Sequence, residues 1–209
     1  NKIKTNGITY FFNRSLLNKI HERKIIPLKY KHDKMYIIEY PLNKSIREVK
    51  SEIEIEVKIA DFQDFKFLIT HRKDRWFTAK AVESRFNRGD ICFIGIVDGK
   101  AVCCLWATFC GTVGLPEVEY DLKLESNIIG LIDGYTLPEY RGLKIYAKTW
   151  NSFINFLKKK HPGKKVYGFV PASNIRSSKV HKRLNLDKVV MTIELTKFLG
   201  FKRHRIVKL

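Results

Sequence analysis

The residues best suited to chemistry lie at positions 138–146, which read Pro-Glu-Tyr-Arg-Gly-Leu-Lys-Ile-Tyr. This stretch follows an apolar segment, residues 128–137, and precedes a segment whose apolar residues recur at helical spacing. An Arg-Gly turn at a helix start offers free backbone N–H groups, a favourable helix dipole and the fixed charge of Arg141. The combination predicts a site for a phosphate group.

Two ionisable side chains could move protons near this turn. His181 lies in a second helical segment, residues 174–184, and an imidazole exchanges protons near neutral pH. Neighbouring cations would lower its pKa and favour proton donation, although a solvated surface histidine is the alternative. Asp133, in the apolar segment before the turn, is the best candidate for a general base. Its alternative is a carboxylate satisfied at the strand end or paired with a lysine.

The turn resembles the acyl-CoA pyrophosphate loop of the GNAT superfamily of N-acyltransferases. That loop reads arginine or glutamine, two residues, glycine, one residue, then glycine or alanine. Arg141 matches the first position, and Gly142 and Ile145 are common companions there. Lys144 replaces the first glycine and Tyr146 replaces the last small residue. The Arg-Gly-x-x-Ile-Tyr form is similar to a subgroup associated with envelope polysaccharide synthesis.

The segment at residues 174–186 resembles a second GNAT motif, a helix that runs Asn-x-x-Ala/Ser, three residues, Tyr. Asn174 matches the asparagine that commonly contacts the coenzyme arm, and Ser177 matches the small residue. His181 stands where the family's tyrosine often serves as general acid to the leaving thiolate. Asn185 replaces a glycine and can still adopt a positive φ.

The resemblance implies acyl transfer from a thioester to a primary amine. The donor would be acetyl-CoA, another acyl-CoA or an acyl carrier protein, and the acceptor an amino sugar or another envelope precursor. Asp133 would deprotonate the amine, His181 would protonate the thiolate, and backbone N–H groups at the strand end would hold the oxyanion. The expected coenzyme-binding residues are Thr136, Leu137, Arg141, Gly142, Leu143, Lys144, Ile145, Tyr146, Asn174 and Ser177. The six histidines are scattered, so no metal site is expected.

The charge of the chain favours anionic partners. Its 209 residues carry a net charge of +19, from 40 Lys and Arg against 21 Asp and Glu. A basic rim would suit nucleotide phosphates or an acidic acyl carrier protein. A nucleic-acid-binding protein is the rival interpretation, but the cations are spread along the chain and no reader motif occurs, so no nucleic-acid partner is expected. A GNAT-like protein without activity stays open, because Lys144 and Tyr146 depart from the motif.

The cysteines and the apolar runs predict a cytoplasmic protein. Cys92, Cys103, Cys104 and Cys110 include no C-x-x-C pair and read as free core thiols in a reducing compartment. The first residues lack the apolar region of a secretory signal. The longest apolar run, residues 101–110, is too short to span a bilayer of about 30 Å, so no transmembrane segment is expected.

The elements that must position these residues form an α/β (α+β) pattern. Residues 1–50 are expected to be an N-terminal extension with a strand at 7–12, a short helix at 16–23 and two strands at 25–40 around a turn near His32-Asp33, followed by a linker at 41–50. Residues 51–209 are expected to be the acyltransferase domain. Its expected strands are 52–60, 91–97, 101–108, 128–137, 165–170 and 188–195. Its expected helices are 61–70, 78–86, 143–160 and 174–184.

The remaining segments are assigned by their turn residues and charge. Asp98-Gly99 is the strongest hairpin signal in the chain. Residues 111–126 are expected to be irregular, and residues 197–209 a basic tail. The order of elements predicts a mixed, mostly antiparallel central sheet flanked by helices. This order also resembles that of GNAT proteins.

Overall fold

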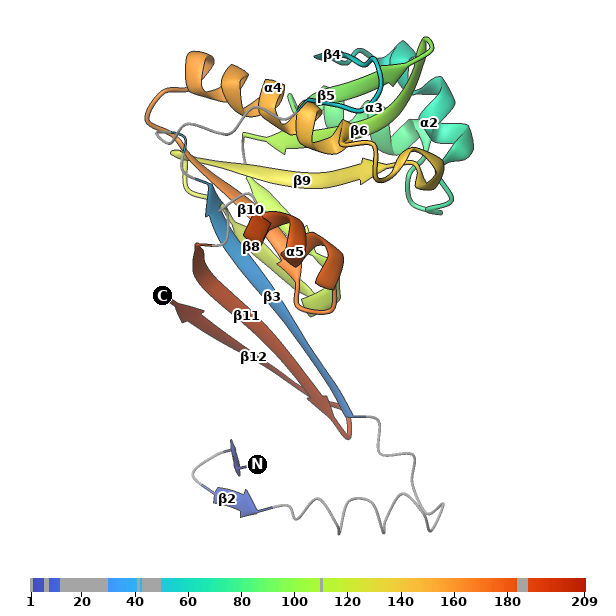
Figure 1. The fold of residues 1–209 in the computed structure, drawn as a ribbon. Helices are drawn as coiled ribbons and strands as arrows, with labels where there is room; N and C mark the ends of the chain where they lie inside the picture. The colour runs from blue at the N-terminus through green and yellow to red at the C-terminus, as the bar shows by residue number, and fades with distance from the viewer. Residues whose placement is uncertain are drawn as a thin grey trace.

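An eight-stranded sheet organises the chain, with the strand order β12-β11-β3-β10-β9-β6-β5-β4 (Figure 1). The computed structural model describes residues 2–5, 8–11, 30–40, 42, 50–109, 111–183 and 188–209. Neighbouring strands are antiparallel except β9 and β10, which are parallel. The strands are β3 (Tyr30–Tyr40), β4 (Glu56–Ile59), β5 (Ile91–Val97), β6 (Lys100–Thr108), β9 (Ile128–Thr136), β10 (Lys165–Pro171), β11 (Val189–Phe198) and β12 (Phe201–Lys208). The predicted mixed, mostly antiparallel sheet is confirmed.

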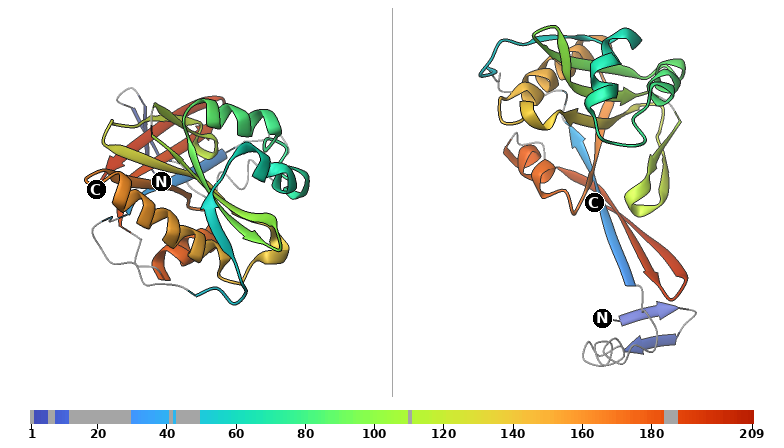
Figure 2. Two further views of the ribbon diagram at one scale, coloured as in Figure 1. Left: turned by 90° about the horizontal axis from the view of Figure 1, so that it is seen from above. Right: turned by 90° about the vertical axis from the view of Figure 1, so that its right-hand side faces the viewer.

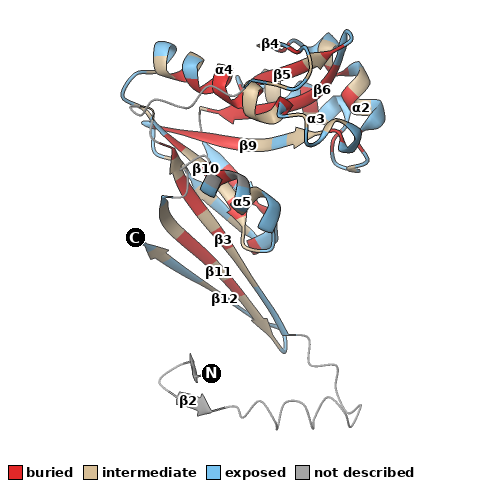
Figure 3. Ribbon diagram, viewed as in Figure 1, coloured by how far each residue is buried: buried red, intermediate tan, exposed pale blue. Residues whose placement is uncertain are grey.

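Helices cover both faces of the β4–β9 part of the sheet. On one face lie η1 (Phe62–Phe65), α2 (Lys66–His71) and α3 (Ala79–Asn87), packed on a core that includes Trp106. On the other lies α4 (Ile145–Lys160), which packs on Phe93 and Leu105. The alternation of side chains along β5 and β6 explains these two cores, because successive residues point to opposite faces. The buried residues follow the strands and the inner sides of the helices in Figure 3.

Short-range signals predicted the starts of two helices and the β5–β6 hairpin correctly, whereas the helix expected from residue 143 begins at Ile145. Asp61 forms a capping box with Asp64, and Thr78 accepts from the amide of Ala81 at the start of α3. Asp98 and Gly99 both have positive φ, 48° and 72°, as a tight hairpin turn between β5 and β6 requires.

The N-terminal part of the chain contributes a central strand. Residues 30–40 form the single unbroken strand β3, which lies between β10 and β11, so the predicted turn at His32-Asp33 is wrong. Pairing on both edges holds the backbone extended through those polar residues. Two further strands, β1 (Lys2–Thr5) and β2 (Ile8–Phe11), pair with each other. The predicted helix at 16–23 and most of the predicted linker lie outside the described residues, and the boundary at residue 50 stays a prediction.

Two segments that were not expected to form strands contain them. Residues 112–123 fold into a hairpin made of β7 (Thr112–Leu115), η2 (Pro116–Val118) and β8 (Tyr120–Lys123). Its apolar residues pack on β3 and β11, which form a third core on the far side of the sheet from α5 (Ile175–Arg183). The predicted basic tail is β12, which pairs with β11 along its whole length through a turn at Leu199-Gly200. The strand predicted at 52–60 forms only at Glu56–Ile59.

The sheet has two parts that diverge where its parallel pair ends. The strands β4, β5, β6 and β9 form one part with α2, α3 and α4, and β3, β11 and β12 extend away from it as a second part (Figures 1 and 2). β10 joins the two parts, and α5 follows it. The divergence positions the candidate site.

Candidate active site

A cavity of about 930 Å³ opens where β9 and β10 separate. The parallel register runs from Ile128↔Lys165 to Leu131↔Gly168 and stops there. β9 continues along β6 as far as Thr136, so its later residues have no partner in β10 within the described part of the chain. The wall of the cavity comes from β3, β6, β9, β10, α4, α5, the β7–β8 hairpin and the segment from the end of α2 through α3.

A bulge in β9 sends two neighbouring residues to opposite sides of the sheet. The pairing with β6 shifts between Cys104↔Tyr135 and Trp106↔Ile132, and Asp133 within the bulge has a φ of 52°. The Asp133 side chain contacts residues from α2 and α3, whereas Gly134 faces α4. A Cβ at Gly134 would lie 2.7 Å from Tyr146 Oη, so the glycine makes room for the Tyr146 ring. Tyr146 therefore replaces a small motif residue without a clash.

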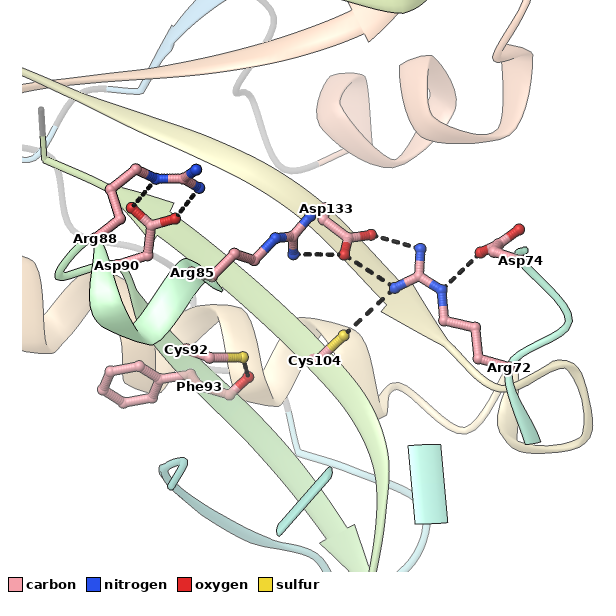
Figure 4. A network of polar contacts seen from close by, with 9 residues as sticks. All are labelled: Arg72, Asp74, Arg85, Arg88, Asp90, Cys92, Phe93, Cys104 and Asp133. Carbon is pink, nitrogen blue, oxygen red and sulfur yellow. Dashed lines mark hydrogen bonds and ion pairs between the residues drawn. The ribbon is translucent and has the colours of Figure 1, made fainter. Parts of the chain in front are cut away.

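Asp133 is held by two arginines (Figure 4). Arg72 binds it with both terminal nitrogens, Nη1–Oδ2 at 3.0 Å and Nη2–Oδ1 at 2.6 Å, and Arg85 Nη1 adds a bond to Oδ2 at 2.8 Å. The Asp133 side chain is 8% exposed. Three charge-assisted hydrogen bonds already occupy most of the acceptor positions of this carboxylate, so few are left to contact a substrate amine. This geometry does not favour the expected general-base role, and the partner is a pair of arginines rather than a lysine.

Arg72 is itself fixed from all sides. Its Nε donates to Asp74 Oδ2 at 2.6 Å, and its guanidinium lies 4.6 Å, 4.2 Å and 4.1 Å from the ring centroids of Trp76, Phe77 and Tyr135. Cation–π contacts of this kind are stabilising when the cation is desolvated. Arg72 therefore acts as a rigid support for Asp133.

The start of α4 has the features of an anion site. Lys144 precedes the helix in the left-handed conformation, with φ 59°, and its side chain makes no capping hydrogen bond to the first turn. That conformation favours glycine, the residue that the GNAT motif carries there. The Lys144 ammonium pairs with Glu52, at 2.8 Å, and not with the first turn of α4. The first N–H groups of a helix have no partner within the helix and can bind an anion. Arg141 closes the turn through a bond from Nε to Thr136 O at 3.0 Å.

The end of β9 does not supply the oxyanion donor that was expected at Leu137. The Leu137 N–H donates to Val102 O at 2.9 Å, and the Leu137 side chain is fully buried. Thr136 uses its hydroxyl to contact Cys103 Sγ at 3.3 Å. Because this N–H already takes part in pairing with the β6 strand, it is not free to donate to an oxyanion. Gly134 and Tyr135 line the cavity instead.

His181 and Tyr40 form a hydrogen-bonded pair in the cavity wall. His181 Nε2 lies 2.6 Å from Tyr40 Oη, and His181 Nδ1 lies 2.8 Å from Ser177 O. Because a carbonyl oxygen can only accept, Nδ1 carries the imidazole proton and Nε2 accepts the Tyr40 hydroxyl. His181 is buried and is not the solvated surface residue of the alternative interpretation.

Burial keeps both members of this pair neutral near pH 7. Desolvation lowers the pKa of His181 below its usual value of 6.5, against an opposing contribution from the Ser177 carbonyl. The direction matches the prediction, but the main cause is burial rather than the neighbouring cations. Desolvation also raises the pKa of Tyr40 well above 10.0. The phenol thus stays protonated and the imidazole stays able to accept a proton.

Tyr40 reaches His181 from the far end of the sequence. It is the last residue of β3, and β3 pairs with β10, which places its ring over Gly168. A Cβ at Gly168 would lie 2.6 Å from Tyr40 Cε2, so this strand position requires a glycine. The Trp150 ring meets the Tyr40 ring edge-on at 4.7 Å. Sequence analysis missed Tyr40, and its only signal was the alternation of Tyr36, Ile38 and Tyr40.

The structure brings part of the predicted site together. Asn174 caps α5 by accepting from the Ser177 amide at 3.0 Å. The cavity wall includes Asp133, Tyr146, Asn174, Ser177 and His181. The other expected coenzyme contacts lie outside this wall, in the connection from β9 to α4 and in the first turn of that helix. They are Thr136, Leu137, Arg141, Gly142, Leu143, Lys144 and Ile145.

In the part of the chain that the structure describes, no group of three or more histidine, cysteine, aspartate or glutamate side chains is arranged to hold a metal ion. Among the helices of the described chain, none is both long enough and apolar enough to cross a membrane.

Comparison with known proteins supports the fold. No family model matches the sequence, and no curated protein matches it. A proposed acetyltransferase of the GNAT family from Novosphingobium aromaticivorans superposes with a TM-score of 0.53 at 11% identity, over 81% of this chain and 66% of that one. A Drosophila protein superposes with a TM-score of 0.53 at 12% identity, over 90% of this chain and 59% of that one. An N-acetyltransferase from Staphylococcus aureus superposes with a TM-score of 0.49 at 16% identity, over 64% of this chain and 83% of that one.

The likeness to the Novosphingobium protein shows that the chain has the GNAT fold. The chain spans about two thirds of that protein and less of the Drosophila protein. The fold class predicted from the order of elements is therefore confirmed.

Proposed function

We propose that the protein is an N-acyltransferase that moves an acyl group from a thioester donor, acyl-CoA in the first instance, to a primary amine. The observation that carries the proposal is the cavity between the diverging strands β9 and β10, with the Tyr40–His181 pair in its wall. Both reacting groups would meet in this cavity. The GNAT fold supports the same reaction class.

The donor's pyrophosphate would bind at the start of α4. The first turn of this helix, the left-handed Lys144 and the guanidinium of Arg141 together offer backbone N–H groups and positive charge. Asn174 and Ser177, at the start of α5, would line the path of the coenzyme arm into the cavity. An acidic acyl carrier protein would find complementary charge on this chain, whose net charge is +19.

Tyr40 and His181 would move the proton that the reaction releases. The amine nitrogen attacks the thioester carbon, a C–N bond forms and the C–S bond breaks. The amine proton passes to Tyr40 Oη while the Tyr40 proton passes to His181 Nε2, which is positioned to accept it at 2.6 Å. The proton then returns through Tyr40 Oη to the leaving thiolate. One proton has moved from nitrogen to sulfur, and the pair is restored.

Calorimetric titration with coenzyme A and with acetyl-CoA tests the donor site. We expect binding by the wild-type protein and at least about tenfold weaker binding by Arg141→Ala, because charge-assisted bonds to phosphate contribute about 1.5–3 kcal/mol each. Arg75→Ala is the matched control, since Arg75 is exposed and outside the cavity wall. Equal binding by Arg141→Ala and the wild type would contradict the proposed donor site.

Turnover identifies the donor and the acceptor. Free acyl-CoA and an acylated carrier protein are offered in parallel with a panel of amines that includes amino sugars, since an envelope precursor is part of the proposal. Release of free thiol that depends on the amine is the expected result. Absence of amine-dependent thiol release with both donors and the whole panel would contradict an N-acyltransferase.

A further inference from the structure

The cavity continues past the bulge of β9 to a second group of side chains, on the face opposite α4. This group consists of Arg72, Asp74, Trp76, Arg85 and Asp133, and we call it the arginine cluster. Figure 4 shows its members other than Trp76. All five residues line the same cavity as Tyr40 and His181. Since the start of α4 would take the donor, the arginine cluster lies where an acceptor would enter.

The two arginines of the cluster are not equivalent. Arg72 uses Nε and both terminal nitrogens on carboxylates and has aromatic rings packed around its guanidinium. Among the residues that the structure describes, Arg85 donates from Nη1 alone, to Asp133 Oδ2, although a guanidinium has five N–H donors in all. Its side chain is only 14% exposed. A largely desolvated cation with unused donors is costly unless a partner of opposite charge completes it.

The tryptophan rings near Arg85 indicate from which side an anionic partner would approach its guanidinium. The guanidinium of Arg85 lies 5.0 Å from the ring centroid of buried Trp106 and 5.5 Å from that of Trp76. Trp76 is 52% exposed, in contrast to the buried aromatic residues around it, and so offers an open ring at the cavity wall. A ligand that reaches the free donors of Arg85 would also meet this ring.

We propose that the acceptor is a small amine that also carries an anionic group, and that Arg85 binds this group. The proposal rests on the acyl-transfer function proposed above and narrows its substrate class. Carboxylate and phosphate both match the planar fork of a guanidinium, so either is a suitable anion. Asp74 and Glu117 line the same cavity and complement the positive charge of the amine. The ion pairs of Arg72 and Asp133 hold Arg85 in place.

The test compares amines that differ in the anion. With acetyl-CoA as donor, glucosamine 6-phosphate is compared with glucosamine, and L-serine with L-serinamide. We expect the charged member of at least one pair to have a kcat/KM about 10- to 100-fold higher, mainly through KM, and the pair that responds distinguishes phosphate from carboxylate. In Arg85→Gln this preference should fall to near unity, because Arg72 still holds Asp133. Arg75→Gln removes an exposed charge outside the cavity wall and should keep the preference.

A direct binding measurement separates this proposal from the proposed function. Inorganic phosphate and acetate are titrated by calorimetry into wild-type protein, Arg85→Gln and Arg75→Gln, each saturated with coenzyme A so that the start of α4 is occupied. If coenzyme A does not bind, the same titrations are made on the free protein. Anion binding that Arg85→Gln alone weakens supports the proposal. No anion binding by the wild type, or a preference that survives in Arg85→Gln, overturns it, whereas the proposed function fails only if no amine is acylated.

Discussion

Replacing Tyr40 by phenylalanine removes one oxygen atom and tests the proton-transfer pair directly. The Tyr40 hydroxyl is the group that His181 Nε2 accepts from at 2.6 Å, while His181 Nδ1 stays bound to Ser177 O. The substitution keeps the ring over Gly168 and against Trp150, so the packing of β3 is preserved. It therefore isolates the hydroxyl from the rest of the side chain.

The expected effect on catalysis is large and the expected effect on stability is moderate. General acid–base groups contribute about 10²- to 10⁴-fold, so we expect kcat to fall at least about 100-fold, or about 2.7 kcal/mol in the barrier. Loss of the hydroxyl also leaves a buried imidazole nitrogen without its donor, which costs about 1–3 kcal/mol of folding free energy. The melting temperature should then fall by several degrees, at about 2–4 °C per kcal/mol for a chain of this size.

The assay follows thiol release from the acyl donor over a range of pH, with Tyr36→Phe as the control. Tyr36 lies on the same strand and on the same face as Tyr40 but does not line the cavity. We expect Tyr36→Phe to retain wild-type kcat. A Tyr40→Phe protein that is folded and turns over as fast as Tyr36→Phe would refute the proton-transfer role.

Two further predictions concern packing and pH. Gly168→Ala should destabilise the protein by about 1–3 kcal/mol in thermal unfolding, because its Cβ would collide with the Tyr40 ring, whereas Gly114→Ala, with 3.4 Å to its nearest neighbour, should change stability by less than about 0.5 kcal/mol. Equal changes in stability in the two variants would show that the Tyr40 ring moves aside at little cost. Because burial lowers the pKa of His181 in the folded state, the unfolded chain binds this proton more readily, and stability should fall as pH drops below about 6.5. Chemical unfolding between about pH 5 and pH 7 should show a flatter dependence in His181→Gln than in the wild type. Burial also lowers the pKa of His161, so this residue contributes to the pH dependence of stability with the same sign. If His161→Gln flattened the dependence and His181→Gln did not, the effect would belong to His161.

The features of the fold that were predicted correctly from the sequence are formed by residues that lie close together in the chain. Asp61, Thr78 and Asn174 cap their helices with bonds to amides two or three residues away, and Asp98-Gly99 closes a turn by its own conformation. The strands β7, β8 and β12 were missed, although each pairs with the strand next to it in the sequence. The turn predicted inside β3 is wrong because β10 and β11, which lie far along the chain, hold its polar residues extended. No local pattern of residues reports those partners.

The residues of the candidate site also fall into two groups, those that a local motif predicts and those that only the fold brings together. Arg141, Asn174 and His181 lie in motifs that can be recognised in a short stretch of sequence. Tyr40, Arg72 and Arg85 come from separate segments, and only the sheet and its covering helices bring them to one cavity. Asp133 was correctly singled out, yet its role could not be read from the sequence, because its arginine partners lie 61 and 48 residues away.

The position of β3 determines when the site can assemble during protein synthesis. β3 leaves the ribosome before all the other strands of the large sheet, yet its two partners, β10 and β11, are among the last to be made. Until residue 198 has been synthesised, β3 cannot complete its pairing, and its backbone must stay solvated or be protected by other factors. The contact between Tyr40 and His181 spans 141 residues, which makes closure of the site a late and slow step of folding. If the proposed function holds, a nascent chain would gain its proton-transfer pair only after α5 has been synthesised and β3 has paired with β10.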